Sequence, residues 1–308
     1  MKFRTCFVVF VLLPFVVDAS GWTHEAGSFY SEISFGFAHS DRLFNSRGGK
    51  VPIELPVNPG NILLGRKESS YVQQDISLYL EYGLGWDTQI QLSAPYVLRA
   101  AQEIDRGSYE VSGFSDLTVG LKHNWLNLPW IVSALEVTLG VPTGDENAKS
   151  NSVDNFVPQT IPLGDGEYDL LTRLHVSHGF TAVPMYVSTN VGYRFRDLNG
   201  GTGFQNDLHW GCDAGYSIEI LKNSDWLPKI TPTFAARGFH SLGSKGDVTN
   251  PALIFSGNVP GQSLIDIQPG LFISIWKKLA LNTSYAYTVW GQNTSAGWTL
   301  RTGIAWEH

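Results

Sequence analysis

In the segment WDTQIQLSAPY, residues 86–96, mostly apolar and polar side chains alternate from one residue to the next. One face takes Trp86, Thr88, Ile90, Leu92, Ala94 and Tyr96, and the other takes Asp87, Gln89, Gln91 and Ser93. Because successive side chains of a β-strand point to opposite faces, this period of two predicts a strand with one apolar and one polar face. The apolar face has an aromatic residue at each end and aliphatic residues between, which is typical of a strand that faces lipid.

The same alternation recurs along the whole chain and predicts twelve strands. Their apolar faces lie within residues 29–37, 76–82, 86–96, 117–125, 131–141, 168–180, 185–195, 208–220, 230–236, 265–275, 279–289 and 298–306. Most of these segments reach ten residues or more, whereas strands of globular proteins average about five or six. No break in composition marks a linker, so we expect one domain over residues 20–308.

The connections between these segments alternate in length. Short turns are expected near residues 83–85, 127–129, 181–184, 224–226 and 276–278. The connections between them are mostly longer, at 40–70, 97–113, 142–167, 197–206 and 240–263, whereas the last, at 291–297, is shorter. Outer-membrane barrels have short periplasmic turns and longer extracellular loops. With an even number of strands, both ends of the chain then fall on the periplasmic side.

Composition separates a barrel from a soluble β-sandwich, which also has one buried face per strand. Aromatic residues make up 13% of the chain, charged residues only 16%, and there are 32 glycines. The predicted outward positions contain no Asp, Glu, Lys or Arg, and the charges fall on the opposite face. We therefore predict an all-β fold, a closed antiparallel transmembrane β-barrel of about twelve strands with a polar lumen.

The first nineteen residues have the layout of a secretory signal peptide. Lys2 and Arg4 precede an apolar run at residues 6–17, and residues 17–19 form a small-residue cleavage signal. We expect cleavage after Ala19 and delivery to the outer membrane of a Gram-negative cell. The remaining chain has a net charge of about −8 and keeps Cys212 alone, so an internal disulfide is excluded.

Four segments resemble a known family of outer-membrane proteins. They are GFSDLTVGLK at 113–122, LEVTLGVPTGD at 135–145, GDGEYDL at 164–170 and NVGYR at 190–194. In this order they are similar to the family named for a MetA pathway of phenol degradation. The resemblance implies an outer-membrane barrel that moves small, often hydrophobic or aromatic, compounds. It supplies no functional residues to carry over.

Charged side chains on the polar face are the candidates for lining the lumen. They are Lys122, Glu136, Asp169, Arg173, His175, Arg194, Arg196, Asp207, Asp213 and Arg237. We expect Arg173 to lie close to Arg194 with His175 beside them, Arg196 near Asp169 and Asp207, and Asp213 near Arg237. Such a set could be a charged constriction that selects solutes. It could equally be a network of ion pairs that fills the lumen, since buried charges need partners.

Two further groups are weaker candidates. Ser133 and His123 are expected to face each other outward across one hairpin, as a lipid or ester hydrolase of the outer membrane would need. No third group orients the histidine, and no G-x-S-x-G motif is present. The acidic residues of 142–169 could attract a hard cation, but their spacing does not match an EF-hand, and we predict no metal site.

The sequence therefore predicts a passive outer-membrane channel or transporter for small solutes, rather than an enzyme. Two alternatives stay open: a hydrolase that uses Ser133 and His123, and a closed barrel with a structural or adhesive role. The expected partners are outer-membrane lipid, the solute and the machinery that assembles outer-membrane proteins. No cofactor and no nucleic acid are expected, since no basic run suggests the latter.

Overall fold

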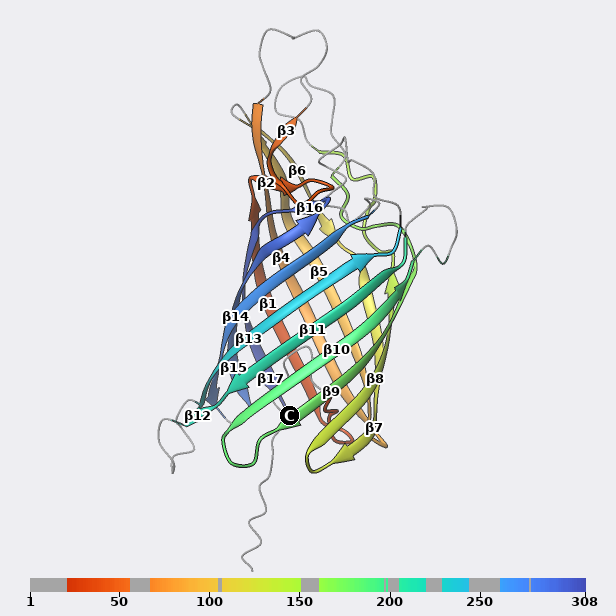
Figure 1. Cartoon of the computed structure of the whole chain (residues 1–308), viewed down its shortest axis with the longest axis vertical. Helices are drawn as coiled ribbons and strands as arrows, with labels where there is room; N and C mark the ends of the chain where they lie inside the picture. The colour runs from red at the N-terminus through yellow and green to blue at the C-terminus, as the bar shows by residue number, and fades with distance from the viewer. Residues whose placement is uncertain are drawn as a thin grey trace, which may run out of the picture.

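The computed structural model describes residues 21–55, 67–104, 107–150, 161–196, 198, 205–219, 229–243, 261–276 and 278–308. The predicted signal peptide lies outside these residues. Among the described residues, no helix is long and apolar enough to cross a membrane. The described elements are β-strands, and twelve of them form the wall of a single closed cylinder (Figure 1).

Each wall strand runs antiparallel to its neighbours, and β17 pairs with β1 to close the ring. In ring order the strands are β1 (Phe29–Ser40), β4 (Lys67–Gly85), β5 (Thr88–Ile104), β7 (Leu117–Leu128), β8 (Ile131–Val141), β9 (Asp169–Gly179), β10 (Met185–Phe195), β11 (Asp207–Tyr216), β13 (Lys229–Ser241), β14 (Ser263–Trp276), β15 (Leu279–Gln292) and β17 (Trp298–Glu307). Closure leaves no unpaired sheet edge. The predicted twelve-stranded barrel is confirmed.

Side chains alternate between the two faces of the wall as the sequence predicts. On β7, Leu121 is 48% exposed on the outside, whereas Lys122 beside it is 4% exposed and faces the interior. Ile33 on β1 and Ile304 on β17 are likewise exposed on the outside. The exterior is therefore a continuous apolar surface, of the kind that lipid covers in membrane barrels.

The two ends of the cylinder differ, and we call them the turn end and the loop end. At the turn end, lowest in Figure 1, short connections join β4 to β5, β7 to β8 and β9 to β10. Trp86 and Asp87 form a two-residue turn, both with positive φ, as a type I′ hairpin requires. The expectation that Trp86 begins a strand was wrong, because the turn takes it out of the β5 ladder.

The loop end is more ordered than the sequence suggests. Residues 40–70 and 97–113 were expected to be loops, and this was wrong in part. The first contains β2 (Arg42–Phe44), β3 (Lys50–Leu55) and the start of β4, and β5 continues past the wall to pair with β6 (Gly107–Phe114). The other short elements are β12 (Ile218–Glu219), which pairs with β13, and β16 (Thr294–Ser295), which pairs with β2.

A small hydrophobic core explains the extra strands at the loop end. Ile53 of β3 is fully buried, and it belongs to one cluster with Tyr71, Val97 and Tyr109 from β4, β5 and β6. Leu163, from the connection between β8 and β9, is part of the same cluster. Burying apolar area in this cluster stabilises strand pairs that stand outside the barrel wall.

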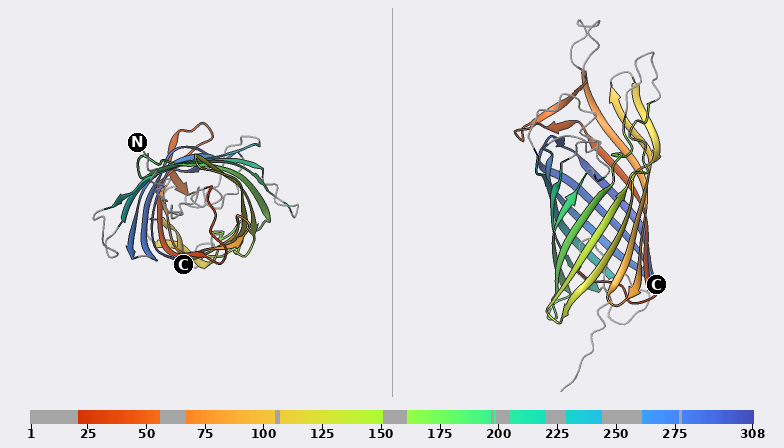
Figure 2. Two further views of the ribbon diagram at one scale, coloured as in Figure 1. Left: turned by 90° about the horizontal axis from the view of Figure 1, so that it is seen from below. Right: turned by 90° about the vertical axis from the view of Figure 1, so that its right-hand side faces the viewer.

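The segment 21–28, which we call the crossing segment, lies in the interior of the barrel at the turn end. It precedes β1, yet the backbone N–H of Gly21 donates to Oγ of Ser177 on β9, 2.7 Å away. The ring of Trp22 packs edge-on against Tyr186 of β10. Strands β9 and β10 lie five and six positions from β1 in the ring of twelve, so the segment extends across part of the lumen (Figure 2, left).

Candidate functional site in the lumen

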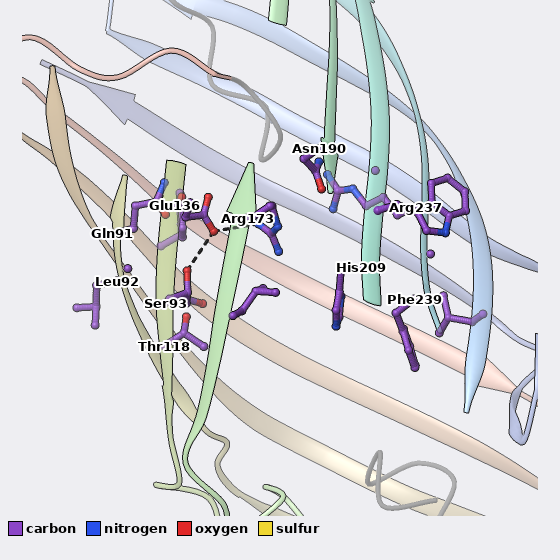
Figure 3. A pocket seen from close by; sticks show the side chains of 18 residues that line it. Gln91, Leu92, Ser93, Thr118, Glu136, Arg173, Asn190, His209, Arg237 and Phe239 are labelled. Atoms are coloured by element: carbon purple, nitrogen blue, oxygen red, sulfur yellow. Dashed lines mark hydrogen bonds and ion pairs between the residues drawn. The ribbon is translucent and has the colours of Figure 1, made fainter. Parts of the chain in front are cut away.

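A cavity of about 410 Å³ occupies the middle of the lumen. Its lining comes from strands β4 round to β14, and Figure 3 shows the side chains converging on it. Glu136, Arg173 and Arg237 are the charged residues of this lining. Gln91, Ser93, Thr118, Thr138, Asn190 and His209 add polar groups, and Leu171, Phe239 and Leu264 add apolar ones. Chemically, the cavity is a polar chamber with apolar patches.

Glu136 is the centre of a buried ion-pair network on one wall of the cavity. Its two carboxylate oxygens contact Nη1 of Arg173 at 3.0 Å and Nε2 of His175 at 2.9 Å. Lys122 stands directly opposite Glu136 on β7 and is also buried. Since buried charges are tolerated only when paired, this network fixes the position of Arg173 at the cavity rim.

A second network, which we call the loop-end clamp, closes the gap between the wall and the connection that follows β8. Nη2 of Arg194 lies 2.7 Å from Asp169 and 3.3 Å from Asp165. Nη2 of Arg196 lies 3.0 Å from Asp165, and its Nη1 lies 3.7 Å from Asp207. Glu167 accepts from Nε of Arg196 at 2.5 Å. Two arginines thus hold four carboxylates, and two of these belong to the connection rather than to the wall.

Three of the ten predicted lumen residues, Glu136, Arg173 and Arg237, line the cavity, and the register between strands places the expected pairs. Arg173 lies opposite Gly192 and Arg194 lies opposite Leu171, so the two arginines are diagonal neighbours on adjacent strands. Each contacts a carboxylate, Glu136 for Arg173 and Asp169 for Arg194. The neighbourhood of Arg196 and Asp207 is confirmed, whereas Asp169 contacts Arg194.

Arg237, on β13, lines the cavity three strands away round the ring from Arg173 on β9. It stands opposite Gly211 on β11 and opposite Asp266 on β14. Asp213, the predicted neighbour of Arg237, lies two residues further along β11 and is buried. Arg237 therefore has Asp213 as a diagonal neighbour, and it lines the cavity while Asp213 does not.

The Ser–His pair expected on the outer face is not formed. The hairpin turns at Pro129 and Trp130, two residues later than expected, so Ser133 lies opposite Leu126, and beyond a β-bulge between Asn124 and Leu126 His123 lies opposite Leu135. Oγ of Ser133 donates to the backbone carbonyl of His175, and Nδ1 of His123 contacts Thr88. With neither group able to activate the other, the geometry removes this candidate for hydrolysis.

The acidic residues of 142–169 do not gather as metal ligands. Among the described residues, no group of three or more His, Cys, Asp or Glu side chains is arranged to hold a metal ion. Asp165, Glu167 and Asp169 contact arginines in the loop-end clamp. These three carboxylates therefore form ion pairs with arginines of the barrel wall.

Sequence reasoning did not name His209 and Phe239 as residues of the cavity, and it missed the whole crossing segment. His209 has the same strand parity as Asp207 and Asp213, so alternation on β11 was sufficient to place it inside. Phe239 follows in the same way from Arg237 on β13. No local pattern marks residues 21–28, because their contacts are with strands β4, β5, β9 and β10.

No family model matches the chain, and no curated protein matches its sequence. Its fold, by contrast, is similar to those of solved outer-membrane barrels. An outer membrane channel from Pseudomonas putida F1 superposes with a TM-score of 0.62 at 12% identity, over 96% of this chain and 100% of that one. The β-domain of the Bordetella autotransporter BrkA gives 0.53 at 11% identity, over 92% and 100%. At such identities the likeness shows the barrel fold alone.

Proposed function

We propose that this protein is a channel of the Gram-negative outer membrane that lets small solutes pass through its lumen. The observation that carries the proposal is the contrast between the two faces of one wall. The exterior is apolar and exposed, whereas the interior is polar and surrounds a cavity of about 410 Å³. A lumen filled by packed apolar side chains would favour a structural barrel, and a polar cavity with charged lining residues favours passage.

The proposed orientation places the turn end in the periplasm and the loop end outside the cell. Short turns on one side and elaborated loops on the other are the usual asymmetry of such barrels. In this orientation the crossing segment narrows the periplasmic exit, and the loop-end clamp narrows the external mouth. The resemblance of four segments to a family of aromatic-compound transporters supports small, hydrophobic or aromatic solutes.

We also propose that the chain is exported and cleaved after Ala19. Cleavage there leaves Ser20 as the first residue, directly before Gly21, whose N–H bonds to Ser177 inside the barrel. Mass spectrometry of the protein purified from outer membranes tests the proposal, and a mature chain that still begins at Met1 would refute it.

Liposome swelling and single-channel conductance test passage directly. The purified full chain, folded in vesicles, is expected to admit neutral sugars with a cut-off set by the cavity. Thr138→Trp adds bulk to the cavity lining and is expected to reduce conductance several-fold. Val137→Trp adds the same bulk at the neighbouring position, which faces outward, and serves as the matched control.

Two results would contradict the proposed function. One is an intact barrel, shown by its heat-modifiable migration on gels, that passes no solute of any size. The other is equal conductance in the Thr138→Trp and wild-type proteins. The first result would favour the closed structural or adhesive barrel, whose working parts would be its loops, and the second would show that passage does not depend on this cavity.

A further inference from the structure

The cavity wall from β9 to β13 has an unusual distribution of donors. Arg173 and Arg237 contribute two guanidinium groups, and Glu136 is the single carboxylate among the residues that line the cavity. Asp266 stands opposite Arg237 but does not line the cavity. The lining itself therefore has a net positive charge, although the chain as a whole is acidic.

Two of the residues that line the cavity have a buried side-chain atom with no hydrogen-bond partner among the described residues. These atoms are Nε of Arg173 and Nε2 of His209. Nearly all buried polar atoms in native proteins are hydrogen-bonded, and Nε of Arg173 can only donate, so the cavity wall has room for an acceptor that the protein does not supply. Both atoms belong to residues that face the same chamber (Figure 3).

Two glycines let the side chains of Arg173 and Asn190 lie flat against the wall between the two arginines. Arg173 lies opposite Gly192, and Arg237 lies opposite Gly211, so the two strands between β9 and β13 present backbone at these positions. The first two carbons of the Arg173 side chain lie over Gly192, where a Cβ would be 3.3 Å from each. Asn190 lies over Gly211 in the same way. The hollow is thus flanked by two cations and bordered by an amide donor.

An apolar wall adjoins this hollow. The rings of His209 and Phe239 stack with centroids 5.6 Å apart and an interplanar angle of 24°. Leu171 and Leu264 extend the apolar surface on either side. A flat organic body could pack on the two stacked rings while an attached charged group reached the guanidinium groups.

We infer that the lumen cavity is a binding site for small organic carboxylates with an aromatic or other flat apolar body. The carboxylate is received by Arg173 and Arg237 with Asn190, and the body packs on His209 and Phe239. This inference rests on the proposed channel function and specifies its solute class. Planar guanidinium groups match the geometry of a carboxylate, which accounts for arginine rather than lysine at both positions.

The test compares three probes of one shape and different charge. Benzoate, benzyl alcohol and benzylammonium are titrated into the detergent-solubilised full chain by calorimetry. A charge-assisted hydrogen bond is worth about 1.5–3 kcal/mol, so benzoate is expected to bind at least ~10-fold more tightly than benzyl alcohol. Benzylammonium is expected to bind most weakly.

Variants identify the groups that bind the carboxylate. Arg237→Gln and, separately, Arg173→Gln are expected to weaken benzoate binding about tenfold and leave benzyl alcohol unchanged. Arg301→Gln is the matched control, because Arg301 pairs with Asp75 on the lumen wall but does not line the cavity. Arg173→Lys keeps a cation beside Glu136 but removes the planar guanidinium group. Benzoate binding that is stronger than in Arg173→Gln but weaker than in the wild type would show that the guanidinium geometry contributes as well as the charge.

Several outcomes would overturn the inference. Equal affinity for benzoate and benzyl alcohol would exclude an anion site. Equal losses of benzoate affinity in Arg301→Gln and Arg237→Gln would show that the charge of the whole lumen, and not a specific site, determines binding. Liposome swelling with neutral sugars distinguishes failure of this inference from failure of the channel proposal. A barrel that passes sugars but does not prefer benzoate contradicts the carboxylate site and leaves the channel proposal standing.

Discussion

Nε2 of His24, in the crossing segment, lies 2.7 Å from Oε2 of Glu81 on β4, and both side chains are buried. Glu81 also accepts hydrogen bonds from the hydroxyl of Tyr79 at 2.6 Å and the amide of Gln91 at 2.9 Å. The backbone N–H of His24 donates to Gln89 on β5. The crossing segment is therefore hydrogen-bonded at His24 as well as at Gly21, and these bonds hold it in place at the turn end.

Loss of the contact between His24 and Glu81 is expected to make the crossing segment more mobile. In His24→Ala, the crossing segment loses its side-chain contact with Glu81, and we expect larger or noisier single-channel currents than in the wild type. Glu25→Ala is the matched control, since Glu25 is exposed in the same segment. Currents that stay identical in His24→Ala would show that the segment does not restrict passage.

Gly36→Ala is expected to destabilise the barrel wall. A Cβ on Gly36 would lie 2.5 Å from an oxygen of Asp75 and 2.8 Å from a nitrogen of Arg301, between the two members of an ion pair. Overpacking of this kind costs about 1–3 kcal/mol. Urea unfolding in vesicles measures it. Gly179→Ala, whose Cβ would meet only Trp22 at 3.9 Å, should change stability little; similar losses at both sites would contradict the argument.

Arg196→Gln is expected to release the connection between β8 and β9 from the wall. The Arg196 side chain is buried and contacts Asp165, Glu167 and Asp207, so its removal leaves buried carboxylates without their cation. Such a change costs about 3–5 kcal/mol, and protease cleavage near residues 161–168 should become faster. Arg99→Gln removes a more exposed arginine and is the control. Unchanged cleavage in Arg196→Gln would exclude a clamp.

Stability of the β5–β6 hairpin is expected to fall in acid. A hydrogen bond from Arg99, together with one from Ser108, lowers the pKa of Glu110 below its usual range. A carboxyl whose folded pKa is below its unfolded pKa stabilises the fold above the unfolded value and loses that contribution as pH falls through the folded one. Because both side chains of the pair are partly exposed, the change should stay under about 1 kcal/mol.

Hydrogen-exchange protection of residues 99–104 and 107–110 measures this acid effect once intrinsic exchange rates are corrected at each pH. Arg99→Gln removes the main cause of the lowered pKa and should flatten the dependence. A wild-type hairpin whose protection does not change in acid would contradict the assignment.

A charge on the outer face is expected to oppose membrane insertion. Leu121 is exposed on the outside in the middle of β7, and Leu121→Arg should cost about 2–4 kcal/mol of folding free energy in lipid vesicles. Leu242→Arg places the same charge on an equally exposed leucine beyond the end of β13 and should cost far less. Equal costs would argue against a lipid-facing belt.

The sequence by itself determined the wall. Alternation on segments such as 86–96 is a local property, because each side chain's face follows from its parity within one strand. Twelve alternating segments with apolar outer faces indicate a closed barrel. A closed barrel of such segments gives every backbone group of the wall a hydrogen-bond partner and turns no charged side chain toward lipid. The same parity placed Arg173, Arg194 and Arg237 inside.

Tertiary structure decided what fills that wall. The register between strands sets which lumen charges meet, and a bulge such as the one between Asn124 and Leu126 changes it without a clear local signature. The bond from Gly21 to Ser177 joins residues 156 positions apart, so no periodicity in either segment could reveal it. The cavity likewise depends on side chains from many strands meeting across the lumen, and its position follows from closure of the ring.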